Sequence, residues 1–118
     1  MLLISGGHAR AHYALVLATT AAALGRPTIL FATNAGVRAL LADPPQAADP
    51  QEAVLAARGV GTFAELVAAA ADLGVRRIAC EAGLRVEALE GASLAPGVEV
   101  AGVATFLAAT KGGQVITL

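Results

Sequence analysis

Apolar and polar positions follow one another along the chain in blocks that predict strands and helices in turn. Short apolar runs rich in β-branched residues and bounded by turn residues are typical of buried strands. They predict about five strands, at residues 2–5, 28–32, 75–79, 98–100 and 114–118. Longer stretches of helix-forming residues predict helices at residues 11–24, 36–42, 62–73, 81–89 and 103–110.

Residues between these blocks indicate where helices begin and end. Gly25 and Pro27 end the first long helix. Thr62 and Glu65 form a capping box, in which each side chain satisfies an unpaired backbone N–H at the start of a helix. Residues 43–50 hold three of the five prolines and predict a loop, and residues 51–58 can add a helical turn.

The alternation of strand and helix predicts an α/β fold with a parallel sheet and helices on both faces. Right-handed crossovers favour a doubly wound, flavodoxin-like strand order. A length of 118 residues fits one domain, and neither a repeat nor a linker divides it, so we expect a single domain over residues 1–118.

Composition and charge narrow the class of protein. The net charge is −1 and no basic run is interleaved with aromatic residues, so no nucleic-acid surface is expected. The longest apolar stretch, residues 13–24, falls short of the ~20 residues that a membrane-spanning helix needs. A single cysteine fits a reducing cytoplasm. Because 57% of residues are hydrophobic and only 14% charged, we expect a homo-oligomer in which partner subunits cover part of the surface.

Cys80 is the first candidate for chemistry. It falls at the end of a predicted strand and opens a helix, and ligands of open α/β sheets gather at the carboxyl ends of strands. Unpaired N–H groups and the helix dipole stabilise a thiolate there. A lone cysteine is also one of the most frequently buried residue types, so a core position is an equal alternative.

Glu81 and Arg85 are predicted to tune this site. A neighbouring carboxylate opposes formation of a thiolate, and Arg85, one helical turn further on, can offset that charge. The spacing Cys-x-x-Gly-x-Arg from Cys80 to Arg85 also looks like that of many rhodanese loops, which leaves a rhodanese-like sulfurtransferase as a minor alternative.

A second candidate site lies in the turn after the first strand. Gly6 and Gly7 allow close backbone approach, and the N–H groups of the next helix can hold an anion. In a flavodoxin-like order this turn lies near Cys80, where His8 can act as a proton donor or orienting group. His8 and His12 can equally be surface residues. No metal site is predicted from their spacing, and no dinucleotide motif or flavin-stacking aromatic predicts a cofactor.

Four stretches resemble the DsrE/DsrF-like family, in the family's order. They are LLISGG, ALVLATTAAALGRPTILFATNAGVRALL, RIACEAGL and GVEVAGVATFLAAT. The chain departs from many relatives at His8, where an acidic residue is common, and at residues 82–84, where a methionine-rich helix is common. Only Cys80 matches a functional position of the family.

The resemblance implies a flavodoxin-like parallel fold that assembles into trimers or hexamers. It also implies a sulfur carrier or sulfurtransferase in which Cys80 holds a persulfide passed between donor and acceptor proteins. Two other hypotheses remain. One is a non-enzymatic assembly subunit or small-ligand-binding module with an inert cysteine, and the other is a nucleotide or flavin binder that uses the Gly6–Gly7 turn.

Overall fold

A parallel sheet forms the centre of the molecule. The computed structural model describes residues 1–118, with four strands in the order β1-β2-β3-β4. Every neighbouring pair is parallel, with Phe31 opposite Ile78 and Cys80 opposite Ala101. The strands are β1 (Leu2–Leu3), β2 (Ile29–Ala32), β3 (Arg76–Cys80) and β4 (Glu99–Ala101). The α/β fold with a parallel sheet, predicted from the alternating pattern, is confirmed.

The C-terminal segment lies beside β1, on the side away from β2. The Leu2 N–H donates to the Ile116 carbonyl at 2.8 Å, and the Leu118 N–H donates to the Leu2 carbonyl at 2.8 Å. Leu2 and Thr117 form a single parallel bridge there, so the fifth predicted strand is an extended segment with one bridge. β1 therefore lies between β2 and the C-terminal segment, so the sheet extends from β1 in both directions and its strand order reverses there. β3 lies two strands away from β1. A flavodoxin-like order would instead have made β3 a neighbour of β1.

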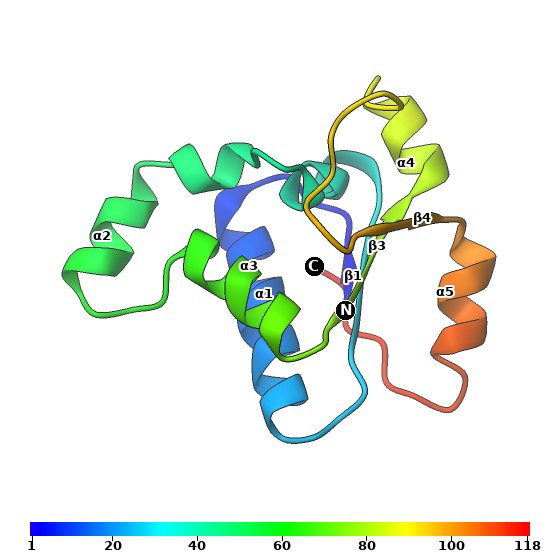
Figure 1. Cartoon of the computed structure of the whole chain (residues 1–118), viewed down its shortest axis with the longest axis horizontal. Coiled ribbons are helices and arrows are strands. Elements are labelled where there is room, and N and C mark those ends of the chain that lie inside the picture. The colour runs from blue at the N-terminus through cyan, green and yellow to red at the C-terminus, as the bar shows by residue number, and fades with distance from the viewer.

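Helices cover both faces of the sheet (Figure 1). On one face α1 (His8–Ala23) and α3 (Phe63–Asp72) pack side by side against the sheet. Half of their buried residues are alanines, which let the helices approach the strands closely. The other face carries α5 (Val103–Ala109), whose one buried residue is Phe106. The second face is therefore thinly covered.

The segments after β2 and β3 differ in detail from the prediction. The predicted helix at residues 36–42 is a 3₁₀ helix, η1 (Asn34–Leu40), and the proline-rich loop contains a second, η2 (Pro45–Ala48). After β3, α4 (Glu81–Val86) ends earlier than expected, and Ala88 two residues later has a left-handed backbone with φ 56°. These ends depend on packing and backbone geometry that local composition does not encode.

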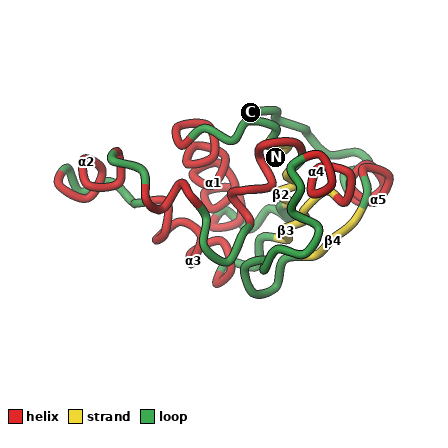
Figure 2. The backbone as a smooth tube through the Cα atoms, turned by 90° about the horizontal axis from the view of Figure 1, so that it is seen from above, coloured by secondary structure: helices red, strands yellow, loops and turns green.

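Residues 51–58, where a helical turn was expected, form α2 (Gln51–Ala57). Figures 1 and 2 show α2 projecting away from the sheet, and none of its residues is buried. The capping box at the start of α3 is confirmed, since the Glu65 N–H donates to the Thr62 hydroxyl at 3.3 Å and the Thr62 N–H donates to Glu65 at 2.8 Å. None of the helices is both long and apolar enough to cross a membrane.

Candidate functional site

Cys80 lies at the carboxyl end of a strand, where the sequence predicts it. It is the last residue of β3 and the N-cap of α4. The first turn of α4 packs closely on η1, because a Cβ on Gly83 would lie only 2.8 Å from the Asn34 nitrogen. Gly83 therefore lets the helix that begins at Cys80 approach the end of β2.

The thiol of Cys80 points into an apolar cluster. Cys80 is 6% exposed and packs with Phe31, Ile78 and Phe106. The rings of Phe31 and Phe106 are stacked, with their centroids 4.8 Å apart. The Cys80 side chain makes no hydrogen bond at the helix start. In this conformation the sulfur is shielded from solvent under α5.

Glu81 and Arg85 pair with each other in solvent. Their side chains form an i, i+4 ion pair at 2.6 Å, with 57% and 66% of the respective side chains exposed. Arg85 therefore pairs with Glu81 rather than with the thiol. Residues 81–86 form a regular helix, in place of the anion-cradling loop that the rhodanese interpretation requires.

The Gly6–Gly7 turn leads directly from β1 into α1. Gly7 is the N-cap of α1, with no side chain capping the helix. A Cβ on Gly6 would lie 2.9 Å from the Ala35 Cβ, so this glycine lets the turn pack against η1. The turn is present where the sequence predicts it.

His8 pairs with a carboxylate that the sequence analysis did not identify. Its Nε2–H donates to Glu52 at 2.6 Å, and 9% of the His8 side chain and 15% of the Glu52 side chain are exposed. Both Glu52 oxygens also accept the Phe63 N–H, at 3.0 and 2.9 Å. The His8 ring stacks on His12, whose Nε2–H donates to the Gly61 carbonyl at 2.8 Å. Both histidines are thus tied into the protein rather than free on its surface.

The structure does not bring His8 and Cys80 together. His8 faces α3 and α2 on one face of the sheet, whereas Cys80 packs beneath α5 on the other. The end of β2 and η1 lie between the two turns, since both Gly6 and Gly83 contact that segment. The expectation that the first turn lies near Cys80 was wrong, because it assumed the flavodoxin-like strand order.

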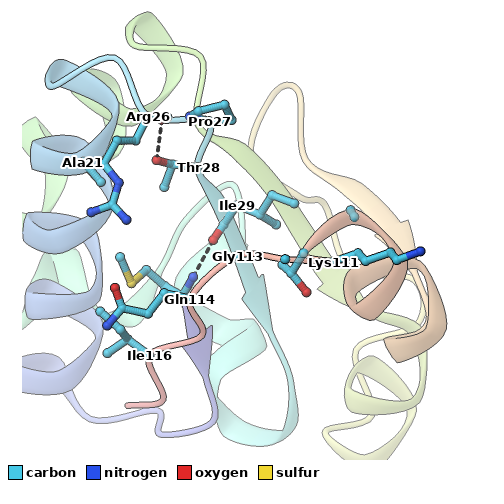
Figure 3. A pocket seen from close by; sticks show the side chains of 13 residues that line it. Ala21, Arg26, Pro27, Thr28, Ile29, Lys111, Gly113, Gln114 and Ile116 are labelled. Atoms are coloured by element: carbon cyan, nitrogen blue, oxygen red, sulfur yellow. Dashed lines mark hydrogen bonds between the residues drawn. The ribbon is translucent and has the colours of Figure 1, made fainter.

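A cavity lies at the end of the sheet opposite Cys80, where the strands begin (Figure 3). It measures about 420 Å³ and contains none of the predicted site residues. Figure 3 shows Arg26 and Gln114 beside it, while Lys111 extends away. A smaller cavity of about 190 Å³ adjoins the Gly6–Gly7 turn. Nowhere do three or more His, Cys, Asp or Glu side chains converge in a way that could hold a metal ion.

Comparisons with known proteins agree with this architecture. The model of the DsrE/DsrF-like family matches residues 1–118. Among solved structures, the crystal structure of the ychN protein from E. coli superposes with a TM-score of 0.67 at 15% identity, over 99% of this chain and 97% of that one. At that identity the superposition shows a shared fold. No curated protein matched the chain in sequence.

Proposed function

Since the chain belongs to the DsrE/DsrF-like family, which is implicated in sulfur relay, we propose that Cys80 receives a sulfane sulfur and passes it on as a persulfide. The observation that carries this proposal is the place of the chain's only cysteine. It stands at the carboxyl end of β3 and begins a helix, at the edge of the sheet where α/β proteins bind and transform ligands. A reducing cytoplasm would suit this role, because it keeps a lone thiol free.

The proposed reaction is a pair of thiol exchanges. The Cys80 thiolate attacks the outer sulfur of a donor persulfide, the S–S bond of the donor breaks, and the donor leaves as a thiolate. Cys80 then carries one extra sulfur. An acceptor thiolate attacks that outer sulfur, and Cys80 is released as a thiolate. No net oxidant or reductant is needed, since each step moves one sulfur atom between thiols.

Burial of the thiol sets a condition on this reaction. Phe106 packs in the same cluster as Cys80, and α5 has seven residues of which only Phe106 is buried. A short helix held by one side chain can separate from its sheet in a local opening that leaves the rest of the fold intact. We therefore propose that α5 moves aside for loading and that its return shields the persulfide from water and reductants.

Incubation with cysteine persulfide followed by intact-mass measurement tests the proposal. The wild-type chain is expected to gain the mass of one sulfur atom, and added dithiothreitol should remove it. Cys80→Ser, which keeps the size of the side chain, is the matched control and should gain nothing. A wild-type chain that stays unmodified with several persulfide donors would rule the carrier role out.

A second candidate function is a non-enzymatic assembly subunit with an inert cysteine. The 6% exposure of Cys80 and its apolar neighbours favour it. Exposed apolar side chains on β4 and α5 also suit a covered surface in a trimer or hexamer; they are Val100, Val103 and Leu107, at 53–59% exposure. This candidate predicts that Cys80→Ser changes neither the oligomeric state in analytical ultracentrifugation nor any partner binding.

A further inference from the structure

The smaller cavity lies where the sheet reverses its order. Its volume is about 190 Å³, and it is lined by Gly6, Gly7, His8, Pro45, Gln46 and Asp49. It adjoins the end of β1, which has β2 on one side and the C-terminal segment on the other. Crevices outside the carboxyl ends of strands at such a reversal are where open α/β sheets bind ligands. Its place in the fold is thus that of a ligand site, separate from Cys80.

Gln46 gives this cavity an unsatisfied acceptor. Gln46 is 3% exposed, and its Nε2 donates to the Gly6 carbonyl at 2.9 Å. Its Oε1 is buried and has no hydrogen-bond partner. Nearly all buried polar atoms in native proteins are paired, because an unpaired one has lost its water without compensation. The Oε1 atom therefore calls for a donor supplied from the cavity.

A carboxylate lines the same space. Asp49 uses its Oδ1 to accept the Gln51 N–H at 2.9 Å and has its other oxygen free. Together with Gln46 Oε1, this oxygen can accept two of the three N–H donors of an ammonium group.

The start of α1 attracts a negatively charged group, in contrast to the acceptors that attract a cation. This helix of 16 residues has no side-chain cap and no acidic residue in its first turn. Its first backbone N–H groups have no partner within the helix and lie at the positive end of the helix dipole. A carboxylate is a suitable partner for them. The cavity therefore presents acceptors for a cation beside donors for an anion.

We propose that this cavity binds a small α-amino acid as its zwitterion. The ammonium group donates to Gln46 Oε1, with the Asp49 carboxylate beside it, and the ligand's carboxylate faces the first turn of α1. A volume of about 190 Å³ corresponds to about six water molecules at about 30 Å³ each, so the ligand is about the size of alanine or serine. A ligand that has only a carboxylate or only an ammonium group would use either the donors or the acceptors of the site, but not both.

NMR titration of the ¹⁵N-labelled full chain tests this assignment. L-Alanine is expected to shift the amide resonances of Gly6, Gly7 and His8 in a saturable way. Acetate and ethylammonium should bind about tenfold more weakly or not at all, since each loses one charged set of hydrogen bonds. N,N,N-Trimethylglycine has both charges but no N–H donors, so it should not bind. Equal binding of this compound and L-alanine, or no saturable shift with L-alanine, would overturn the proposal.

Matched variants assign the binding to Gln46. Gln46→Met keeps the length of the side chain but removes the acceptor, and should weaken L-alanine binding about tenfold. Gln51→Met, on an exposed residue outside the cavity lining, should bind like the wild type. If Gln46→Met does not fold, Asp49→Asn replaces it and should also weaken binding. Unchanged affinity in the folded variant would overturn the assignment and leave Gln46 Oε1 to water.

This inference is independent of sulfur transfer. Cys80→Ser should bind L-alanine as the wild type does, because Cys80 lies under α5 on the other face of the sheet. Weakened binding in Cys80→Ser would contradict the separation of the two sites.

Discussion

The carboxyl ends of β1 and β3 lie on the same side of one sheet, yet the side chains around one end are apolar and those around the other are polar. At the end of β3, Cys80 packs among aromatic and aliphatic side chains, and its thiol makes no hydrogen bond at the helix start. At the end of β1, His8 is held by Glu52, and Gln46 bonds the Gly6 carbonyl. One end is apolar and covered by a single short helix, whereas the other is polar and enclosed by several segments.

The difference teaches that position along a strand does not decide the chemistry of its end. Successive side chains of a strand point to opposite faces, so Cys80 joins Ile78 under α5 rather than the polar groups beside α1. His8 belongs to α1 and turns toward α3. The face to which a side chain points, and the thickness of what covers that face, decide whether it meets water, charge or carbon.

Phe106→Ala should have the largest effect, and only at the β3 end. It empties the space beside Cys80 and Phe31, which costs about 3–5 kcal/mol of unfolding free energy for a buried phenylalanine. Urea unfolding measures this loss. Alkylation of native Cys80 by iodoacetamide should become faster, since the thiol loses its cover.

Leu107→Ala is the matched control, because Leu107 lies next to Phe106 but is 59% exposed. It should change stability by no more than about 0.5 kcal/mol and leave the alkylation rate unaltered. Equal alkylation rates in Phe106→Ala and the wild type would show that α5 does not guard the thiol.

Glu52→Gln should have an intermediate effect, confined to the β1 end. It removes a charged acceptor shared by His8 and the Phe63 N–H, at a cost of about 1–3 kcal/mol in unfolding free energy. Hydrogen exchange at the Phe63 amide should accelerate, while Cys80 alkylation stays constant. Glu90→Gln, on an exposed side chain, is the control. A change in Cys80 alkylation in Glu52→Gln would mean that the two ends are coupled.

Much of this architecture could be predicted from the sequence because it is encoded locally. The apolar runs, the Thr62–Glu65 capping box and the position of Cys80 at a strand end all depend on neighbouring residues. The strand order depends instead on residues far apart in the sequence, since the C-terminal segment pairs with β1. That order was the premise for placing His8 beside Cys80.

The partner of His8 escaped prediction for a related physical reason. Glu52 is 44 residues away in sequence and belongs to a segment whose proline-rich start reads as a loop. Gln46 likewise looks like an ordinary loop residue, although it is almost fully buried. Neither a motif nor a spacing marks such contacts, because they form only when distant segments pack together.

Glu99→Gln should have the smallest effect, again at the β3 end. Glu99 accepts two hydrogen bonds from Arg76 across β3 and β4, at 2.7 and 3.1 Å, and these lower the pKa of Glu99 below its ordinary value of 4.5. A lowered folded-state pKa stabilises the fold above the unfolded value and loses that contribution as pH falls through the folded value. The pair is exposed, so the expected loss is small.

Urea unfolding of Glu99→Gln and the wild type at a series of pH values checks this expectation. Their difference should be constant near neutral pH and shrink below about pH 4.5. A difference that grows as the pH falls would contradict the assigned direction.

Loading and release of sulfur on one sample tests the central claim about Cys80 most directly. The wild-type chain is treated with cysteine persulfide, freed of excess donor, mixed with a thiol acceptor and followed by intact mass. We expect the mass to rise by one sulfur atom and then return as the acceptor becomes a persulfide, with no change in Cys80→Ser. A wild-type chain that gains no sulfur, or that gains one and never releases it, would contradict a carrier role for Cys80.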